Sequence, residues 1–280
     1  MPSFETPQPI AATLEVVLGD LRITAGERTT TRVEVRPSDP SNSEDAKAAE
    51  RTRVEYLNER LLVKAPKLRA WMSRGGGAVD VTVELPAGSS VHGTTASADV
   101  SCDGRLGQCR IRTGLGDIRV DEAGTLSLKA GAGDVSVEHA TGHAELTTGS
   151  GEIRVRELDD SAVVKNSNGD VWIGSVRGDL RLNAANGNIS VDSAGASVVA
   201  KSANGDVRLG EVARGTVVAE TSIGDVEVGI REGAAAWLDV NATAGKVHNA
   251  LTAAEAPAAT EDKVEVRART SVGDVSIRRP

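Results

Sequence analysis

Apolar and polar residues alternate in two short runs within every 18 residues over most of the chain. One run follows a glycine, and counting from that glycine the residues at +2 and +4 are aliphatic, as in Ile189 and Val191 after Gly187. The other run precedes the glycine, with aliphatic residues at −7 and −5, as in Leu180 and Leu182. Alternation with a period of two is the pattern of a strand with one buried face, so each repeat predicts two strands.

The glycine between the two runs recurs at a nearly constant interval. A fixed period of this length is typical of a solenoid, in which each repeat is one coil stacked on the previous one. Strand pairing then runs between coils, so we expect a single-chain parallel β-solenoid, right-handed, with coils about 4.8 Å apart. Glycine is the residue that best tolerates a turn with positive φ. The predicted turn glycines are Gly116, Gly133, Gly151, Gly169, Gly187, Gly205 and Gly224.

Polar residues on both sides of the turn glycines predict two side-chain columns. Asparagine precedes three of the glycines, at Asn168, Asn186 and Asn204, and stacked coils would let these amides hydrogen-bond as a ladder. An acidic residue usually follows the glycine, and stacked carboxylates could hold Ca²⁺. Calcium-binding β-rolls, however, repeat every nine residues with further glycines and aspartates. We therefore expect each carboxylate to accept a hydrogen bond from its own turn, with no structural metal and no cofactor.

The first 97 residues do not follow the 18-residue pattern. Residues 13–23 predict two strands around a tight turn, Ser43 predicts the N-cap of a helix over residues 44–51, and Asn58-Glu59 predicts a hairpin turn. An atypical section of this kind is needed to cap a solenoid, because a bare coil exposes apolar surface and unpaired backbone.

The interval between turn glycines lengthens near the C-terminus, where residues 249–260 predict a surface loop and residues 273–277 predict the last coil. We therefore divide the chain into an atypical β section, residues 1–97, and a repeat array with a C-terminal cap, residues 98–280.

Composition narrows the functional classes. The net charge of −8 argues against nucleic acid and anionic membranes as partners. The first residues show neither a basic segment nor an apolar run, which predicts no signal peptide, no membrane span and a cytoplasmic protein. The two cysteines, Cys102 and Cys109, fall on apolar columns and predict buried free thiols, with a disulfide as the less favoured alternative.

Residues that could perform catalysis are scattered. The chain contains no Gly-x-Ser-x-Gly motif. His139 and His143 are four residues apart, but on a turn and a strand rather than on one helix face, so they do not predict a metal pair. Asp159 and Asp160 are adjacent on a turn, where neighbouring side chains diverge. The sequence therefore predicts that the protein is not an enzyme.

Two features predict contact with a partner. Trp172 stands at the outward +3 position, where other coils carry Arg or Ser. The alternative is that its ring lies over the stems of Lys165 or Arg154. The glycine-rich loop at residues 66–77 carries Arg69, Trp71 and Met72, and it either binds an acidic partner surface or packs on the first coil.

The repeated Gly-Asp-Val/Ile units, an early Gly-Asp-Leu-Arg-Ile at residues 19–23 and the segment 79–89 resemble a bacterial β-strand-repeat family of unknown function. Members of that family are often labelled adhesins. The resemblance implies a β-solenoid without known enzymatic activity, and it carries over no catalytic residues.

We therefore expect a non-catalytic scaffold or binding protein that engages a protein partner or self-associates as a homo-oligomer. One alternative is a cytoskeletal filament that resembles bactofilins. A second alternative is a β-helix enzyme acting on polysaccharide, which would need clustered acids and aromatic platforms. Negative-stain microscopy over a concentration series would separate filaments from a discrete particle.

Overall fold

The computed structural model describes residues 2–66, 77–251 and 263–280. In these residues the protein is a parallel β-solenoid with one short helix, as the sequence predicts. The chain forms two compact units, Met1–Thr141 and Gly142–Pro280. This division reflects packing, whereas the predicted boundary after residue 97 reflects a change of sequence pattern and stays a prediction. The right-handed winding also stays a prediction.

The first unit stacks its coils in an order that differs from the sequence. Strand β2 pairs in parallel with both β6 and β8, and β3 pairs in parallel with both β7 and β9. The coil β2–β3 therefore lies between coils that follow it in the chain. Strand β9 pairs with β3 through its first residues and with β8 through its last, so it passes from one sheet into the other. Strand β10 pairs with β9 along most of its length and does the same. The strands of this unit are β1 (Ser3–Glu5), β2 (Ala11–Leu18), β3 (Leu21–Gly26), β4 (Thr30–Pro37), β5 (Arg53–Leu57), β6 (Arg60–Lys64), β7 (Val79–Pro86), β8 (Ser90–Ser97), β9 (Val100–Leu115), β10 (Ile118–Ala132) and β11 (Val135–Ala140).

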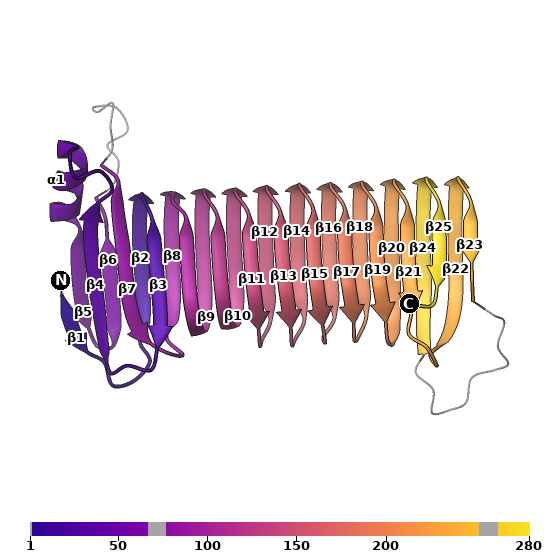
Figure 1. Ribbon diagram of the computed structural model, residues 1–280, viewed down its shortest axis with the longest axis horizontal. Coiled ribbons are helices and arrows are strands. Elements are labelled where there is room, and N and C mark those ends of the chain that lie inside the picture. The colour runs from indigo at the N-terminus through magenta and orange to yellow at the C-terminus, as the bar shows by residue number, and fades with distance from the viewer. Residues whose placement is uncertain (1, 67–76, 252–262) are drawn as a thin grey trace. The chain divides into compact units, whose positions relative to one another are not determined.

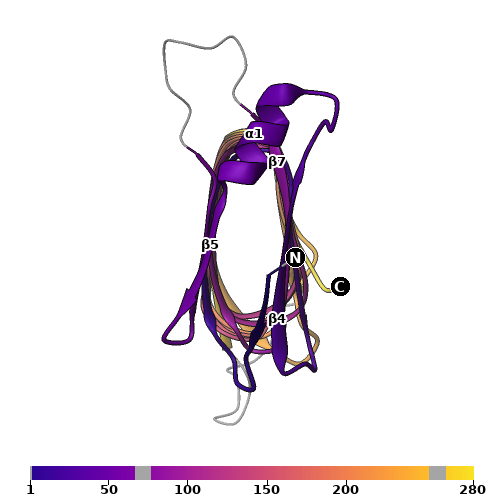
Figure 2. The same cartoon turned by 90° about the vertical axis from the view of Figure 1, so that its left-hand side faces the viewer.

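Antiparallel strands and a helix cover one end of the first unit. Strand β4 pairs with β7 and with β1, and β5 pairs with β6 through the predicted hairpin turn, where Asn58 and Glu59 have positive φ. Helix α1 (Ser43–Arg51) packs on β4 and β7 and lies at one narrow edge of this end, at the top of Figure 2. Its N-cap is Asn42 rather than Ser43, because the Asn42 side chain accepts the hydrogen bond from the Glu44 N–H.

The second unit is a regular stack of two parallel sheets (Figure 1). Strands before the turn glycine pair with one another in one sheet, and strands after it pair in the other, mostly in an 18-residue register. The aliphatic residues predicted at +2 and +4 are at most 2% exposed along this stack. The strands are β12 (Ala144–Ser150), β13 (Ile153–Leu158), β14 (Ala162–Asn168), β15 (Val171–Val176), β16 (Leu180–Asn186), β17 (Ile189–Ala194), β18 (Val198–Asn204), β19 (Val207–Val212), β20 (Gly215–Ile223), β21 (Val226–Ile230), β22 (Ala235–Ala244), β23 (Val247–Asn249), β24 (Lys263–Val272) and β25 (Val275–Arg278).

The last coil in the sequence is not the outermost coil of the second unit, which corrects the expected order. Strand β24 pairs with β20 on one side and β22 on the other, and β25 pairs with β21 and β23. The coil β24–β25 thus lies inside the stack and β22–β23 forms its end. In this inner position Val264 and Val266 of β24 are 2% and 0% exposed.

Candidate functional site

The turn glycines bring neighbouring coils into close contact. Gly187 has a φ of +138°, and a Cβ added there would lie 2.1 Å from the carbonyl oxygen of Gly169. The same arrangement recurs at Gly205, whose added Cβ would lie 2.2 Å from the Gly187 oxygen. A side chain is therefore excluded both by backbone conformation and by the preceding coil.

Asparagine amides form a ladder along one side of these turns. Asn186 Nδ2 donates to Asn168 Oδ1 at 3.0 Å, and Asn204 Nδ2 donates to Asn186 Oδ1 at 2.9 Å. The same column continues as Ile223 and Val272, whose side chains are more than half exposed. In these two coils, an exposed aliphatic residue thus occupies the position of the asparagine.

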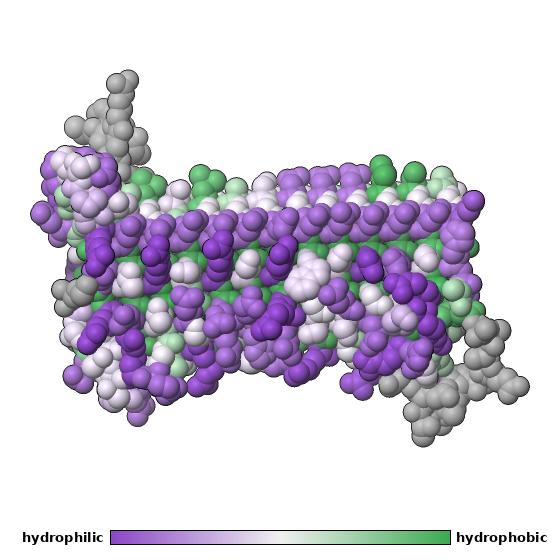
Figure 3. Space-filling view, in the orientation of Figure 1, coloured by the Kyte–Doolittle hydropathy of each residue, from purple (hydrophilic) through white to green (hydrophobic). Residues whose placement is uncertain are grey.

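The column after the glycines is hydrogen-bonded in a way that the sequence did not suggest. Asp170 Oδ1 accepts from the backbone N–H of Asn188 at 2.7 Å, and Asn188 Oδ1 accepts from that of Asp206 at 2.9 Å. Each side chain thus bonds the equivalent residue of the next coil, not its own turn. The reason is that in-register stacking points this N–H along the stack. The column is exposed and lies along the edge of the coils that appears as a hydrophilic row in Figure 3.

A buried polar column inside the turns was missed by the sequence analysis. Three residues before the glycine, Thr221 Oγ1 donates to the Gly205 carbonyl at 2.9 Å and Thr270 Oγ1 donates to the Gly224 carbonyl at 2.8 Å. Asn166 Nδ2 likewise donates to the Gly151 carbonyl of the preceding coil at 3.0 Å, and also to the Gly169 carbonyl of its own turn at 2.8 Å. The recurrence of Thr, Ser or Asn at this position was the available signal.

Trp172 lies beside a groove on the sheet formed by strands β13, β15, β17 and β19. Its row continues to Arg154 on one side and to Ser190 on the other. A cavity of about 240 Å³ opens here at the surface. Its lining comprises Glu152, Ile153, Arg154, Asp170, Val171, Trp172, Asn188 and Ser190.

The other predicted contact residues, Arg69, Trp71 and Met72, lie outside the described residues. Of the predicted partner-binding set, the structure therefore places only Trp172.

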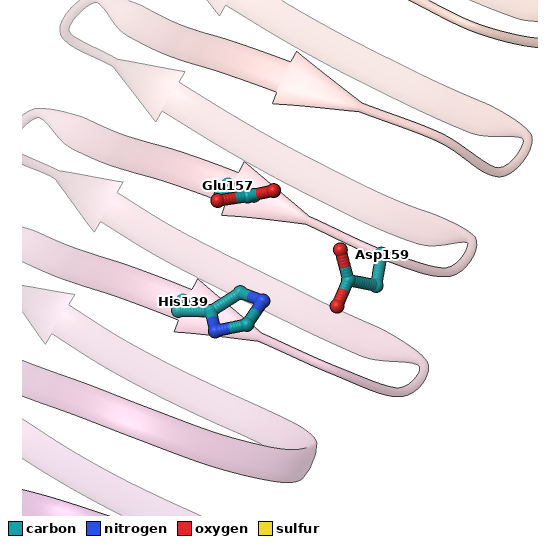
Figure 4. A group of neighbouring side chains, drawn as sticks. All are labelled: His139, Glu157 and Asp159. Carbon is teal, nitrogen blue, oxygen red and sulfur yellow. The ribbon is translucent and has the colours of Figure 1, made fainter.

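Two acidic side chains of the second unit form ion pairs with the same arginine, Arg177. Glu157 on β13 and Asp159 in the turn that follows are drawn in Figure 4, together with His139 of the first unit. Arg177 lies 2.9 Å from Glu157 Oε1 and 2.7 Å from Asp159 Oδ1. The guanidinium thus takes the position between these carboxylates that a bound cation would need. Asp160 instead accepts from the Ser161 N–H at 2.6 Å, so the adjacent aspartates diverge.

His143 and Ser161 lie within hydrogen-bond distance, a contact that the sequence does not predict. His143 Nδ1 is 2.9 Å from Ser161 Oγ, because the two residues occupy equivalent positions on neighbouring coils. A nucleophilic serine needs a histidine that a third group holds in place. In residues 142–251 and 263–280, no carboxylate is hydrogen-bonded to the other ring nitrogen of His143, so this pair lacks the orienting group of a hydrolase.

Cys102 and Cys109 are both buried and unbridged, as predicted. The Cys109 thiol beside Cys102, together with burial, raises the pKa of Cys102 well above its ordinary range. The folded protein therefore keeps Cys102 protonated at a pH where an unfolded chain ionises it.

We expect native protein at pH 8 to react with a chromogenic disulfide reagent far more slowly than unfolded protein. The free energy of unfolding should also decline as pH rises above the ordinary thiol pKa of about 8.5, because only the unfolded state then loses the proton. Urea titrations at pH 7 and pH 9.5 measure this, with Cys102→Ala as the control. Rapid labelling of the native thiols would contradict the burial.

The end of the second unit leaves apolar side chains uncovered. In β22, Leu238 and Val240 are half-buried, whereas their partners Val266 and Ala268 in β24 are fully buried. Trp237 is 57% exposed and Val247 is 43% exposed. Among the described residues, no strand pairs with the outer edge of β22.

In the described part of the chain, no helix has both the length and the apolar character that crossing a membrane requires.

Solved structures that resemble this chain include crystal structures of putative adhesins. The protein from Parabacteroides merdae is 10% identical, and the match covers 100% of this chain and 95% of that chain with a TM-score of 0.48. The protein from Parabacteroides distasonis is 13% identical, with 98% and 95% covered and a TM-score of 0.42. No curated protein matches the sequence.

The family comparison covers almost the whole chain. The model of the Toastrack DUF4097 family matches residues 13–278. This span includes the early Gly-Asp-Leu-Arg-Ile segment and every predicted turn glycine, so it confirms the resemblance predicted from the repeats. The chain belongs to the Toastrack DUF4097 family.

Proposed function

We propose that this protein is a non-catalytic binding scaffold that self-associates through the open end of its second unit. The observation that carries the proposal is the outermost coil β22–β23, which combines half-buried aliphatic side chains with an unpaired strand edge. The adhesin names of the similar solved structures agree with a binding role, and they name no partner.

Among residues 77–251 and 263–280, the edge of β22 lacks the features that keep edge strands from pairing. Natural proteins protect such edges with lysine, proline, bulges or a covering element. Strand β22 spans ten residues and contains neither lysine nor proline, and Asp239 is its only charged residue. The first unit, by contrast, has α1 and the antiparallel strands β4 and β5 at its end. An edge without protection favours a partner that pairs with it.

A second copy of the chain is the occupant that fits this end best. The open end presents the edges of two sheets, β22 and β23, with the apolar interior between them. A single added strand would cover one edge and leave the other edge and the interior exposed. The β22–β23 end of a second copy offers both edges and the same aliphatic interior. The pairing would be isologous, which gives a closed twofold dimer.

The filament alternative requires a different contact. In head-to-tail growth, the β22–β23 end of one copy must pair with an open coil at the start of the next copy. Such contacts do not close into a ring or dimer, so they give an open filament. Helix α1 and the antiparallel strands occupy the start of the first unit. We therefore favour the dimer over a bactofilin-like filament.

We expect Val240→Lys to convert a dimer into a monomer. A lysine at this inward position places a charge in the apolar interior of the contact, which the monomer can instead direct into solvent at its open end. Light scattering coupled to size exclusion, from about 1 to about 100 μM, measures the mass. The matched control is Thr216→Lys, an exposed residue on β20, whose strand is paired on both sides.

Each outcome decides between the alternatives. A wild-type dimer that persists in Thr216→Lys and is lost in Val240→Lys supports the proposal, provided that both variants melt at similar temperatures. A wild-type monomer at every concentration contradicts it. Assemblies that keep growing with concentration select the filament. The cytoplasmic location remains a proposal, and fractionation of the native cell would test it.

A further inference from the structure

We propose that the groove beside Trp172 binds a neutral oligosaccharide. The groove lies on β13, β15 and β17, within the regular part of the second unit, and the proposal does not depend on self-association. Three properties carry it: an indole that its neighbours leave partly uncovered, hydrogen-bonding groups fixed in orientation beside the ring, and a lining of mixed charge.

The two residues in register with Trp172 leave part of its ring exposed. Arg154 is in register with Trp172, but its guanidinium approaches Glu152 Oε2 at 3.4 Å, toward the turn. Ser190, in register on the other side, is too short to cover an indole. Lys165 lies on β14, in the opposite sheet, so it cannot cover the ring either.

A glycine lets the indole extend along its own strand. The far edge of the ring, Cη2, lies 3.2 Å from the place where a Cβ of Gly174 would stand. Trp172 is half-buried as a result, with part of its surface left as one wall of the groove. An aromatic wall offers a stacking surface for the C–H face of a sugar ring.

Hydrogen-bonding groups next to the ring are held in place by the column that runs along the turns. Asp170 and Asn188 each use Oδ1 to accept a backbone N–H of the next coil. Within the described residues, Asp170 Oδ2 and Asn188 Nδ2 have no such partner. A carboxylate acceptor and an amide donor are therefore presented side by side, with the Ser190 hydroxyl close by.

This combination fits a sugar better than other ligand classes. A sugar hydroxyl both donates and accepts, so it satisfies a neighbouring carboxylate and amide together. A cationic ligand would have to approach Arg154, and an anionic ligand would meet Glu152 and Asp170. A protein partner needs about 800 Å² of complementary surface on each side, far more than this small groove supplies.

Fluorescence of Trp172 alone provides the test. The chain has three tryptophans, so the variant Trp71→Phe/Trp237→Phe leaves Trp172 as the single indole reporter. We would titrate it with tetramers of glucose, N-acetylglucosamine and galacturonic acid. We expect saturable changes with the glucose or the N-acetylglucosamine tetramer at about 0.1–1 mM. We expect none with the uronic acid tetramer, whose carboxylates Glu152 and Asp170 repel.

Isosteric variants separate binding from folding. Asn188→Asp keeps the Oδ1 acceptor for the Asp206 N–H but loses the amide donor, so we expect at least tenfold weaker binding with an unchanged melting temperature. Asp206→Asn makes the reciprocal change one coil further along, outside the groove lining, and should bind normally. Trp172→Ala should abolish binding measured by calorimetry, and Trp172→Tyr should restore part of it.

The proposal is overturned if neither neutral tetramer changes the fluorescence up to about 10 mM. It is also overturned if the uronic acid tetramer binds best, or if calorimetry gives Trp172→Ala the same affinity as the parent. These measurements do not test the oligomeric state, so failure of the sugar proposal would leave the proposed self-association unaffected.

Discussion

Replacing Gly187 with alanine is expected to destabilise the protein by about 3 kcal/mol, a large effect for one methyl group. Two costs act together. The backbone has a φ of +138°, which residues with a side chain rarely adopt, and the new Cβ would overlap the Gly169 carbonyl oxygen of the previous coil. Relief of the overlap requires the coils to separate, which weakens the parallel hydrogen bonds on both sides. Urea unfolding followed by circular dichroism measures the loss.

Alanine variants of two other glycines separate the cost of the backbone conformation from the cost of the steric overlap. Gly233 has a φ of +80° with no atom within 4 Å of an added Cβ, so Gly233→Ala should cost about 1 kcal/mol from conformation alone. Gly26 also has open space and no positive φ, so Gly26→Ala should be nearly neutral. If Gly187→Ala unfolds at the same urea concentration as Gly26→Ala, the close approach of the coils at this turn is wrong.

Deleting residues 263–280 is expected to destabilise the second unit more than deleting residues 235–262, although the second deletion removes a longer segment. The shorter deletion removes β24–β25 from inside the stack, which leaves β22–β23 without its partner and exposes the aliphatic interior next to β20–β21. The longer deletion removes the outermost coil and joins Ala234 to Lys263, and β24 can keep its pairing with β20.

Thermal unfolding of the two deletion variants and the full chain measures the difference. We expect the melting temperature of the 235–262 deletion to stay close to that of the full chain, because its lost coil was only half-buried. Deletion of 263–280 should lower the melting temperature by many degrees or cause aggregation. The opposite order would place the last coil of the sequence at the end of the stack, as the repeat spacing alone predicts.

The repeat pattern predicts the coils well because it reports which side chains face inward. Val207 and Leu209 alternate with polar residues, and only an inward-facing strand gives them the burial observed. The same pattern says nothing about which coil lies next to which. All coils carry similar aliphatic columns, so β20 can accept β24 as readily as β22, and the chain connections and the quality of packing decide.

The candidate groove is predictable only in part. The +3 position correctly predicts that Trp172 faces outward, and the stack places Ser190 beside it. The hydrogen bond from the Asn188 N–H to Asp170 was not predicted, because reasoning about turns considers residues a few positions apart, and this bond joins residues 18 positions apart. The open edge of β22 was also not predicted, because the repeat pattern does not indicate which coil lies at the end of the stack.

The position of β2–β3 has a consequence for how the protein forms during synthesis. These strands leave the ribosome before any other coil, yet both of their neighbours, β6–β7 on one side and β8–β9 on the other, are made later. The first coil therefore gains its first neighbour only when residues 60–86 have emerged, and its second neighbour only when residues beyond 100 have emerged. A stack that could otherwise grow one coil at a time behind the ribosome instead begins with a delayed, cooperative step. Chaperone contact with the nascent chain is expected to concentrate in that interval.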